Sequence, residues 1–96
     1  MNFMQILVVE DEVSLADAIV AILKKEQYFA DAVYDGKDGL DYALSGIYDL
    51  ILLDIMLPKM NGIEVLKELR KQGISTPVML LTAKSEVDDK IRGLDT

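Results

Sequence analysis

The chain has 96 residues, of which 51% are hydrophobic, which fits one small globular domain whose apolar runs are too short to cross a bilayer. Its net charge of −7 argues against direct nucleic-acid binding, which needs a basic surface. The chain has no cysteine, which excludes disulfides and fits a cytoplasmic location. It also has no histidine, so Ser-His-Asp and Cys-His catalysis are excluded. Oxygen-preferring cations such as Mg²⁺ are the remaining candidate metals.

The first third of the chain predicts two strands with a helix between them. The apolar run Met4–Val9 is typical of a strand buried on both faces of a parallel sheet. Ser14 is expected to cap a helix that ends at Lys25, with Asp17 completing a capping box. The apolar stripe of this helix consists of Leu15, Ala18, Ile19, Ile22 and Leu23. The range Phe29–Tyr34 is short and carries a charged residue, so it indicates an edge strand.

The middle of the chain predicts a second helix, a central strand and a third helix. A turn at Asp35-Gly36 precedes a short helix whose apolar positions are Leu40, Ala43 and Leu44. The range Asp49–Asp54 indicates a central buried strand, and the turn formers of Pro58–Gly62 break the chain behind it. The range Gly62–Gln72 is expected to be helical, with one apolar face formed by Ile63, Leu66 and Leu69.

The last part of the chain repeats the same alternation. The range Val78–Leu81 indicates another buried strand, and Ser85 starts a fourth helix. The order of strand and helix, four times over with short connections, implies a parallel sheet with right-handed crossovers. We therefore predict an α/β domain.

Polar side chains follow three of the predicted strands at their carboxyl ends. Glu10 and Asp11 follow the first strand, Asp54 ends the third and Thr82 follows the fourth. These ends meet at one edge of a parallel sheet, where open α/β sheets bind ligands. Carboxylates packed together repel one another, which favours a divalent cation such as Mg²⁺ among them. A carboxylate beside such an ion can attack phosphorus and form an aspartyl-phosphate.

Each of these residues also has an ordinary structural interpretation. An acidic pair such as Glu10-Asp11 is often a solvated loop or a helix cap, and Thr82 is often a capping hydroxyl. Pro58 and Gly62 are explained by a turn and a helix start. Asp54 is harder to explain without a function, because an unpaired carboxylate at the end of a buried strand is costly. The combination at three strand ends favours a functional site.

Three segments together resemble the receiver domain of two-component response regulators. They are VVEDE at 8–12, LLDIMLPKMNG at 52–62 and LLTAKSEVDDKIRGLD at 80–95. The resemblance covers residues 4–96 and is strongest to the OmpR/PhoB-type branch, whose members usually carry a winged-helix DNA-binding domain after the receiver. It implies a flavodoxin-like and CheY-like doubly wound sheet, here (βα)4 with strand order 2-1-3-4. It also implies phosphorelay signalling and not enzymatic turnover.

The resemblance assigns the acceptor and the metal ligands. Asp54 would take a phosphoryl group from a histidine of a sensor kinase. Glu10 and Asp11 would hold Mg²⁺ together with Asp54 and the backbone carbonyl of Met56, Glu10 acting through water.

The resemblance also assigns the residues around the phosphoryl group. Thr82 would donate a hydrogen bond to a phosphoryl oxygen, and Ala83 would leave room for the group. Pro58 and Gly62 would shape the loop after the acceptor. Phosphorylation would then switch the conformation and control an output, expected to be transcription, in the parent protein.

The family pattern continues with a fifth strand, which ends in a lysine that pairs with the acceptor, and a fifth helix. None of the lysines Lys59, Lys84 and Lys90 matches that position, so residues 1–96 are expected to form an incomplete receiver domain. The strand Val78–Leu81 would be left as an open edge beside an uncovered apolar face. We therefore expect a homodimer or higher oligomer, with strand or helix exchange as one form.

Two other functions stay open on the sequence. One is a small Mg²⁺-dependent phosphatase that forms an aspartyl-phosphate, although such enzymes usually carry an acid/base aspartate two residues after the nucleophile, where this chain has Met56. The other is an oligomeric structural module in which the site no longer reacts.

Overall fold

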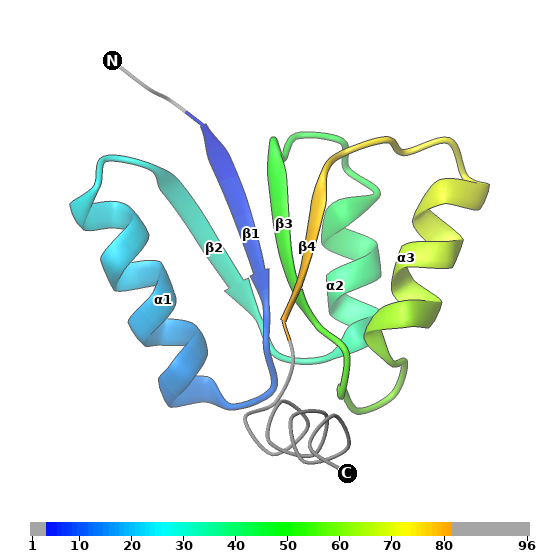
Figure 1. Cartoon of the computed structure of the whole chain (residues 1–96), viewed down its shortest axis with the longest axis horizontal. Coiled ribbons are helices and arrows are strands. Elements are labelled where there is room, and N and C mark those ends of the chain that lie inside the picture. The colour runs from blue at the N-terminus through cyan, green and yellow to red at the C-terminus, as the bar shows by residue number, and fades with distance from the viewer. Residues whose placement is uncertain (1–3, 82–96) are drawn as a thin grey trace, which may run out of the picture.

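A computed structural model of the chain describes residues 4–81, which form strands and helices in strict alternation (Figure 1). The elements are β1 (Gln5–Val9), α1 (Val13–Lys25), β2 (Phe29–Val33), α2 (Gly36–Ala43), β3 (Leu50–Asp54), α3 (Gly62–Lys71) and β4 (Val78–Leu81). The predicted helix that starts at Ser85 lies outside the described residues. In the part of the chain that is described, no helix is long and apolar enough to span a membrane.

The strands form one parallel sheet in the order β2-β1-β3-β4. This confirms the predicted α/β class, the order 2-1-3-4 and the edge position of β2. Val9 of β1 stands opposite Val33 of β2 and Leu53 of β3, and Asp54 stands opposite Leu81 of β4. The carboxyl ends of the strands therefore lie at one edge of the sheet, the lower edge in Figure 1.

Helices cover the sheet on both faces. α1 packs against β1 and β2, whereas α2 packs against β1 and α3 (Figure 1). Side chains alternate between the faces along each strand, so Leu7 and Val9 point toward α2 and α3. They belong to the main core cluster, which also contains Val33, Ala43, Tyr48, Ile51, Leu53, Val65 and Leu69. Each fully buried Leu or Val in this cluster contributes about 1.5–3 kcal/mol to folding.

The start of α1 differs from the prediction. The helix begins at Val13, and the residue at its N-cap position is Glu12, whose side chain makes no capping hydrogen bond. Ser14 is therefore inside the helix and does not cap it. The Asp17 carboxylate does not complete a capping box but accepts a hydrogen bond from the Tyr34 hydroxyl at 2.9 Å.

The buried faces of α1 and α3 are also shifted from the predicted stripes. Leu15 and Ile22 of α1 are 43% and 62% exposed, whereas Ala16 is fully buried. Ile22 lies about 120° around the helix from Ala16, so it points away from the sheet when Ala16 faces it. On α3, Val65 is buried beside Leu69, and Ile63 is exposed.

The β4 side of the described sheet carries exposed apolar side chains. β4 pairs with β3 along one edge, and its central residues Met79 and Leu80 are both exposed. The open apolar edge expected from the sequence, and the oligomer inferred from it, both stay predictions.

Candidate functional site

Three carboxylates meet at the carboxyl edge of the sheet. Glu10 follows β1 and Asp54 ends β3, and the pairing of Val9 with Leu53 brings these two ends side by side. One carboxylate oxygen from each of Glu10, Asp11 and Asp54 lies within 4.8 Å of the others. Glu10 and Asp54 are 6% and 4% exposed, and Asp11 is exposed to solvent. The structure thus brings together the three acidic residues that the sequence singled out.

The environment of Glu10 disfavours its charged form. Burial raises the pKa of Glu10 to about 7, and the nearby carboxyl groups of Asp11 and Asp54 act in the same direction. The amide of Glu12 donates a hydrogen bond of 2.8 Å to Glu10 Oε2, which only partly offsets these effects. Glu10 therefore tends to keep a proton near neutral pH when nothing positive lies beside it.

Asp54 is also held in an environment that disfavours its charge. Burial raises the pKa of Asp54, and the charge of Asp11 adds to this effect. The amide of Met56 donates a hydrogen bond of 3.2 Å to Asp54 Oδ1, which lowers the pKa and orients the carboxylate. The Met56 side chain is 58% exposed, so the backbone of Met56 is the part that faces the acceptor.

These donors fit a hard divalent cation. Buried carboxylates that repel one another are stabilised by a cation, and Mg²⁺ binds carboxylate, carbonyl and phosphate oxygens. Lys59, the basic residue of the loop after Asp54, instead pairs with Asp35 at 3.3 Å. The cluster could therefore hold Mg²⁺ through Glu10, Asp11 and Asp54.

The β3–α3 loop (residues 55–61) follows Asp54 and is closed by backbone contacts. The Ile55 carbonyl accepts hydrogen bonds from the amides of Leu57 and Gly62, at 3.2 and 2.8 Å. A Cβ at Gly62 would lie 2.2 Å from the carbonyl oxygen of Asp54, so no side chain fits there. Pro58 accepts a hydrogen bond from the Met60 amide at 2.8 Å. These contacts agree with the loop-shaping positions expected for Pro58 and Gly62, whose roles stay predictions.

Other expected positions lie outside the described residues. They are Thr82 and Ala83. Lys84 and Lys90, neither of which matches the lysine of the family pattern, also lie outside the described residues. Gly36 was not predicted to belong to the site. Its amide donates a hydrogen bond of 3.2 Å to the Pro58 carbonyl, and the residue lies against the β3–α3 loop. The dipeptide Asp35-Gly36 indicated a turn but not what that turn would contact.

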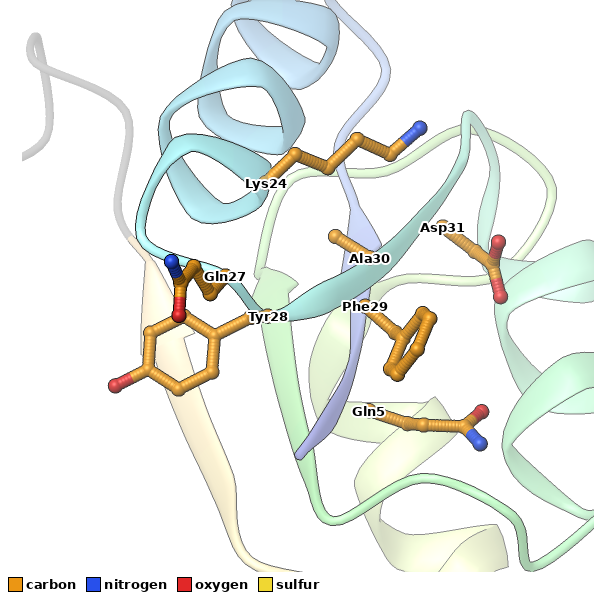
Figure 2. A pocket seen from close by; sticks show the side chains of 7 residues that line it. All are labelled: Gln5, Lys24, Gln27, Tyr28, Phe29, Ala30 and Asp31. Atoms are coloured by element: carbon orange, nitrogen blue, oxygen red, sulfur yellow. The ribbon is translucent and has the colours of Figure 1, made fainter. Parts of the chain in front are cut away.

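A separate hollow lies at the other end of the sheet. This open hollow has a volume of about 600 Å³. It is lined by residues from the starts of β1 and β2 and the end of α1 (Figure 2). Figure 2 shows Lys24 and Ala30 on one side of β2 and Phe29 and Asp31 on the other. None of the three clustered carboxylates lines it, so it is not the acidic site.

Comparisons with known proteins place the chain among related sequences. Residues 6–96 match the response regulator receiver domain. The transcriptional regulatory protein DltR of Streptococcus agalactiae is 56% identical over 92 residues, which cover 96% of this chain and 41% of DltR. The response regulator ArlR of Staphylococcus aureus is 54% identical over 91 residues, which cover 95% of this chain and 41% of ArlR. The chain therefore spans about two fifths of the length of these relatives.

A solved structure shares the same architecture. The response regulator TrrA of Thermotoga maritima, in complex with Mg²⁺-BeF, superposes with a TM-score of 0.80 at 38% identity. The match covers 88% of this chain and 73% of TrrA. This confirms the predicted CheY-like fold class.

Proposed function

Because the chain belongs to the response regulator receiver domain family of phosphorelay signalling, we propose that Asp54 accepts a phosphoryl group from a sensor histidine kinase in the presence of Mg²⁺. The observation that carries this proposal is the cluster itself. A buried aspartate at the end of β3 shares one edge of the sheet with two further carboxylates, all within 4.8 Å. Oxygen donors gathered in this way suit a metal-assisted phosphoryl transfer.

The metal would be held by residues of this chain. Asp11 and Asp54, whose carboxylates cluster with that of Glu10, would be direct ligands. The backbone carbonyl of Met56 would also bind the metal, and Glu10 would act through water. When bound, Mg²⁺ would neutralise charge on the carboxylates and on the transferring phosphoryl oxygens. The Mg²⁺-BeF complex of TrrA supports this assignment by analogy.

Asp54 would act as the nucleophile. The Met56 amide donates a hydrogen bond of 3.2 Å to Oδ1, which would orient the carboxylate for attack on phosphorus. A bond forms between the carboxylate oxygen and phosphorus while the bond between phosphorus and the kinase histidine nitrogen breaks, and its electron pair stays on that nitrogen. Asp54 must be ionised for this step, and its raised pKa means that a positive charge beside it favours the reactive form.

The readout would be a change in conformation. Thr82 would donate a hydrogen bond to a phosphoryl oxygen beside Ala83, and the rearrangement would be passed to an output. DltR is named a transcriptional regulatory protein, which supports transcription as the output of a parent protein of this chain.

Enzymatic turnover of phosphate esters fits the site less well. An aspartyl-phosphate phosphatase needs an acid/base group beside the nucleophile. The side chain two residues after Asp54 is the exposed thioether of Met56, which cannot transfer a proton. We therefore propose an acceptor domain and not a phosphatase.

The cytoplasmic location and the homodimer or higher oligomer expected from the sequence remain predictions. Met79 and Leu80 on β4 are among the exposed apolar residues of the described surface that would support association. Light scattering over a concentration series tests it, and a monomer at every concentration would contradict it.

Intact-mass spectrometry after incubation with acetyl phosphate and Mg²⁺ tests the proposed function. We expect one added phosphoryl group on the wild-type chain and none on Asp54→Asn. Asp31→Asn, which changes a carboxylate of β2, is the matched control and should still be phosphorylated. No added mass on the wild-type chain would contradict the proposal.

A further inference from the structure

The first residue of α2 lies directly against the β3–α3 loop. The Gly36 amide donates a hydrogen bond of 3.2 Å to the Pro58 carbonyl. A Cβ at position 36 would lie 1.6 Å from the carbonyl oxygen of Met60 and 2.6 Å from its carbonyl carbon. Backbone atoms cannot rotate out of the way as the end of a side chain can. Since Gly36 does not have a positive φ, glycine is needed here for space and not for its conformation.

An ion pair joins the same two segments at the surface. Lys59 Nζ lies 3.3 Å from Asp35 Oδ2, while Asp35 Oδ1 accepts a hydrogen bond of 2.8 Å from the Asp38 amide at the start of α2. Lys59 itself has a φ of +69°, which costs a residue other than glycine about 1–2 kcal/mol. The contacts with residues 35 and 36 therefore help to hold the loop in a conformation that the backbone of Lys59 does not itself prefer.

The other end of the β3–α3 loop holds the acceptor. The Ile55 carbonyl closes the loop by accepting from the amides of Leu57 and Gly62. Met56 lies inside this closed segment, and its amide donates to Asp54 Oδ1. A displacement at Met60 therefore reaches Met56 through a short backbone segment with few free torsions.

From these contacts we propose that Gly36 is a positioning residue for the phosphorylation site, acting through Met60 and the β3–α3 loop on the backbone of Met56. The inference rests on the proposed function, because it concerns how the same site is kept in place. A side chain at position 36 would force α2 and the loop apart by more than about 1 Å. Displacements of that size cost up to about 100-fold in reaction rate, and lost supporting contacts cost about 10–100-fold in metal affinity.

Mg²⁺ affinity of Gly36→Ala, measured by calorimetry without any phosphoryl donor, tests the proposal. Gly73→Ala is the matched control, because Gly73 has a φ of +83° and nothing within 4 Å of its added Cβ, so alanine strains the backbone far from the site. We expect the dissociation constant to rise about 10-fold or more in Gly36→Ala and less than about twofold in Gly73→Ala. A purely structural role would lower the stability of both variants and leave both constants unchanged.

An unchanged dissociation constant in Gly36→Ala would overturn the positioning role while leaving the proposed function intact. A wild-type chain that binds no Mg²⁺ would contradict the proposed function and this inference with it.

Amide hydrogen exchange on the wild-type chain provides a second test that needs no variant. Metal binding and local opening are linked. If separation of Gly36 from the β3–α3 loop lowers the Mg²⁺ affinity by some factor, bound Mg²⁺ must make that separation rarer by the same factor. We expect saturating Mg²⁺ to slow exchange of the Gly36 amide about 10-fold more than that of Ile74, whose amide donates to the Leu69 carbonyl after α3. Equal slowing of the two amides would overturn the inference.

Discussion

The carboxylates of Glu10 and Asp54 approach within 4.8 Å of each other although both side chains are buried. Two negative charges at this separation and depth repel strongly, so the folded state needs either a proton or a cation between them. Burial raises the pKa of Glu10 to about 7, so Glu10 is the group that can hold this proton. Mg²⁺ is the cation that the oxygen donors favour.

Mg²⁺ is expected to stabilise the folded chain. At a concentration 100 times the dissociation constant, a ligand that binds only the folded state adds about 2.7 kcal/mol to the free energy of unfolding. Thermal unfolding with and without Mg²⁺ measures this gain. Asp11→Asn should lose most of it, whereas Asp41→Asn on α2, which is outside the cluster, should keep it. Equal gains in the two variants would show that the cluster does not hold the ion.

The metal-free chain is expected to lose stability as the pH rises. The pKa of Glu10 goes from 4.5 in the unfolded chain to about 7 in the fold, so the folded state binds more protons between these values. The free energy of unfolding therefore falls as the pH rises through this window. Urea unfolding of wild type and Glu10→Gln in a chelating buffer measures the effect.

Glu10→Gln removes the charge and keeps the shape. At pH 8 we expect the variant to be more stable than the wild type by about 1–2 kcal/mol, and at pH 4 the two should be nearly equal. A wild type that is the more stable of the two at pH 8 without metal would contradict the assigned environment of Glu10.

The faces of the helices can be tested by truncating two side chains of similar size. Leu69→Ala on α3 is expected to cost about 2–5 kcal/mol, because Leu69 is fully buried in the core cluster. Ile22→Ala on α1 should cost less than about 1 kcal/mol, because Ile22 is exposed. Chemical unfolding measures both losses of free energy. A loss for Ile22→Ala as large as that for Leu69→Ala would show that Ile22 is buried, as the sequence predicted.

A partly buried hydrogen bond joins β2 to the segment before β3. The Tyr48 hydroxyl donates to Asp31 Oδ2 at 2.7 Å, and burial raises the pKa of this phenol. Tyr48→Phe is expected to lower the free energy of unfolding by about 1–2 kcal/mol, since Asp31 loses a donor. Tyr42→Phe, at an exposed phenol on α2, is the comparison and should have little effect in the same urea titration.

Much of the fold could be predicted because its signals are local. The apolar runs of β1 and β3 predicted buried strands correctly, and the predicted strand Val78–Leu81 matches β4 at both ends. The burial predicted for β4 is not found in the described part of the chain, where Met79 and Leu80 are exposed. The acidic cluster followed from topology, because parallel strands must bring Glu10 and Asp54 to one edge.

The errors arose where two local signals compete or where the contact is not local. Helix α1 carries apolar residues on more than one face, so spacing alone could not decide between Leu15 and Ala16 as the buried position. Gly36 could not be recognised as a packing position, because its neighbour Met60 lies 24 residues away in the chain and is brought close only by the fold.

Asp54, and no other carboxylate of the cluster, is proposed to receive the phosphoryl group. Borohydride reduction after incubation with acetyl phosphate and Mg²⁺ converts an aspartyl-phosphate into homoserine, which peptide mass spectrometry can locate. We predict homoserine at position 54 in the wild-type chain, dependent on Mg²⁺. Modification of Glu10 or Asp11 with Asp54 intact would contradict the account.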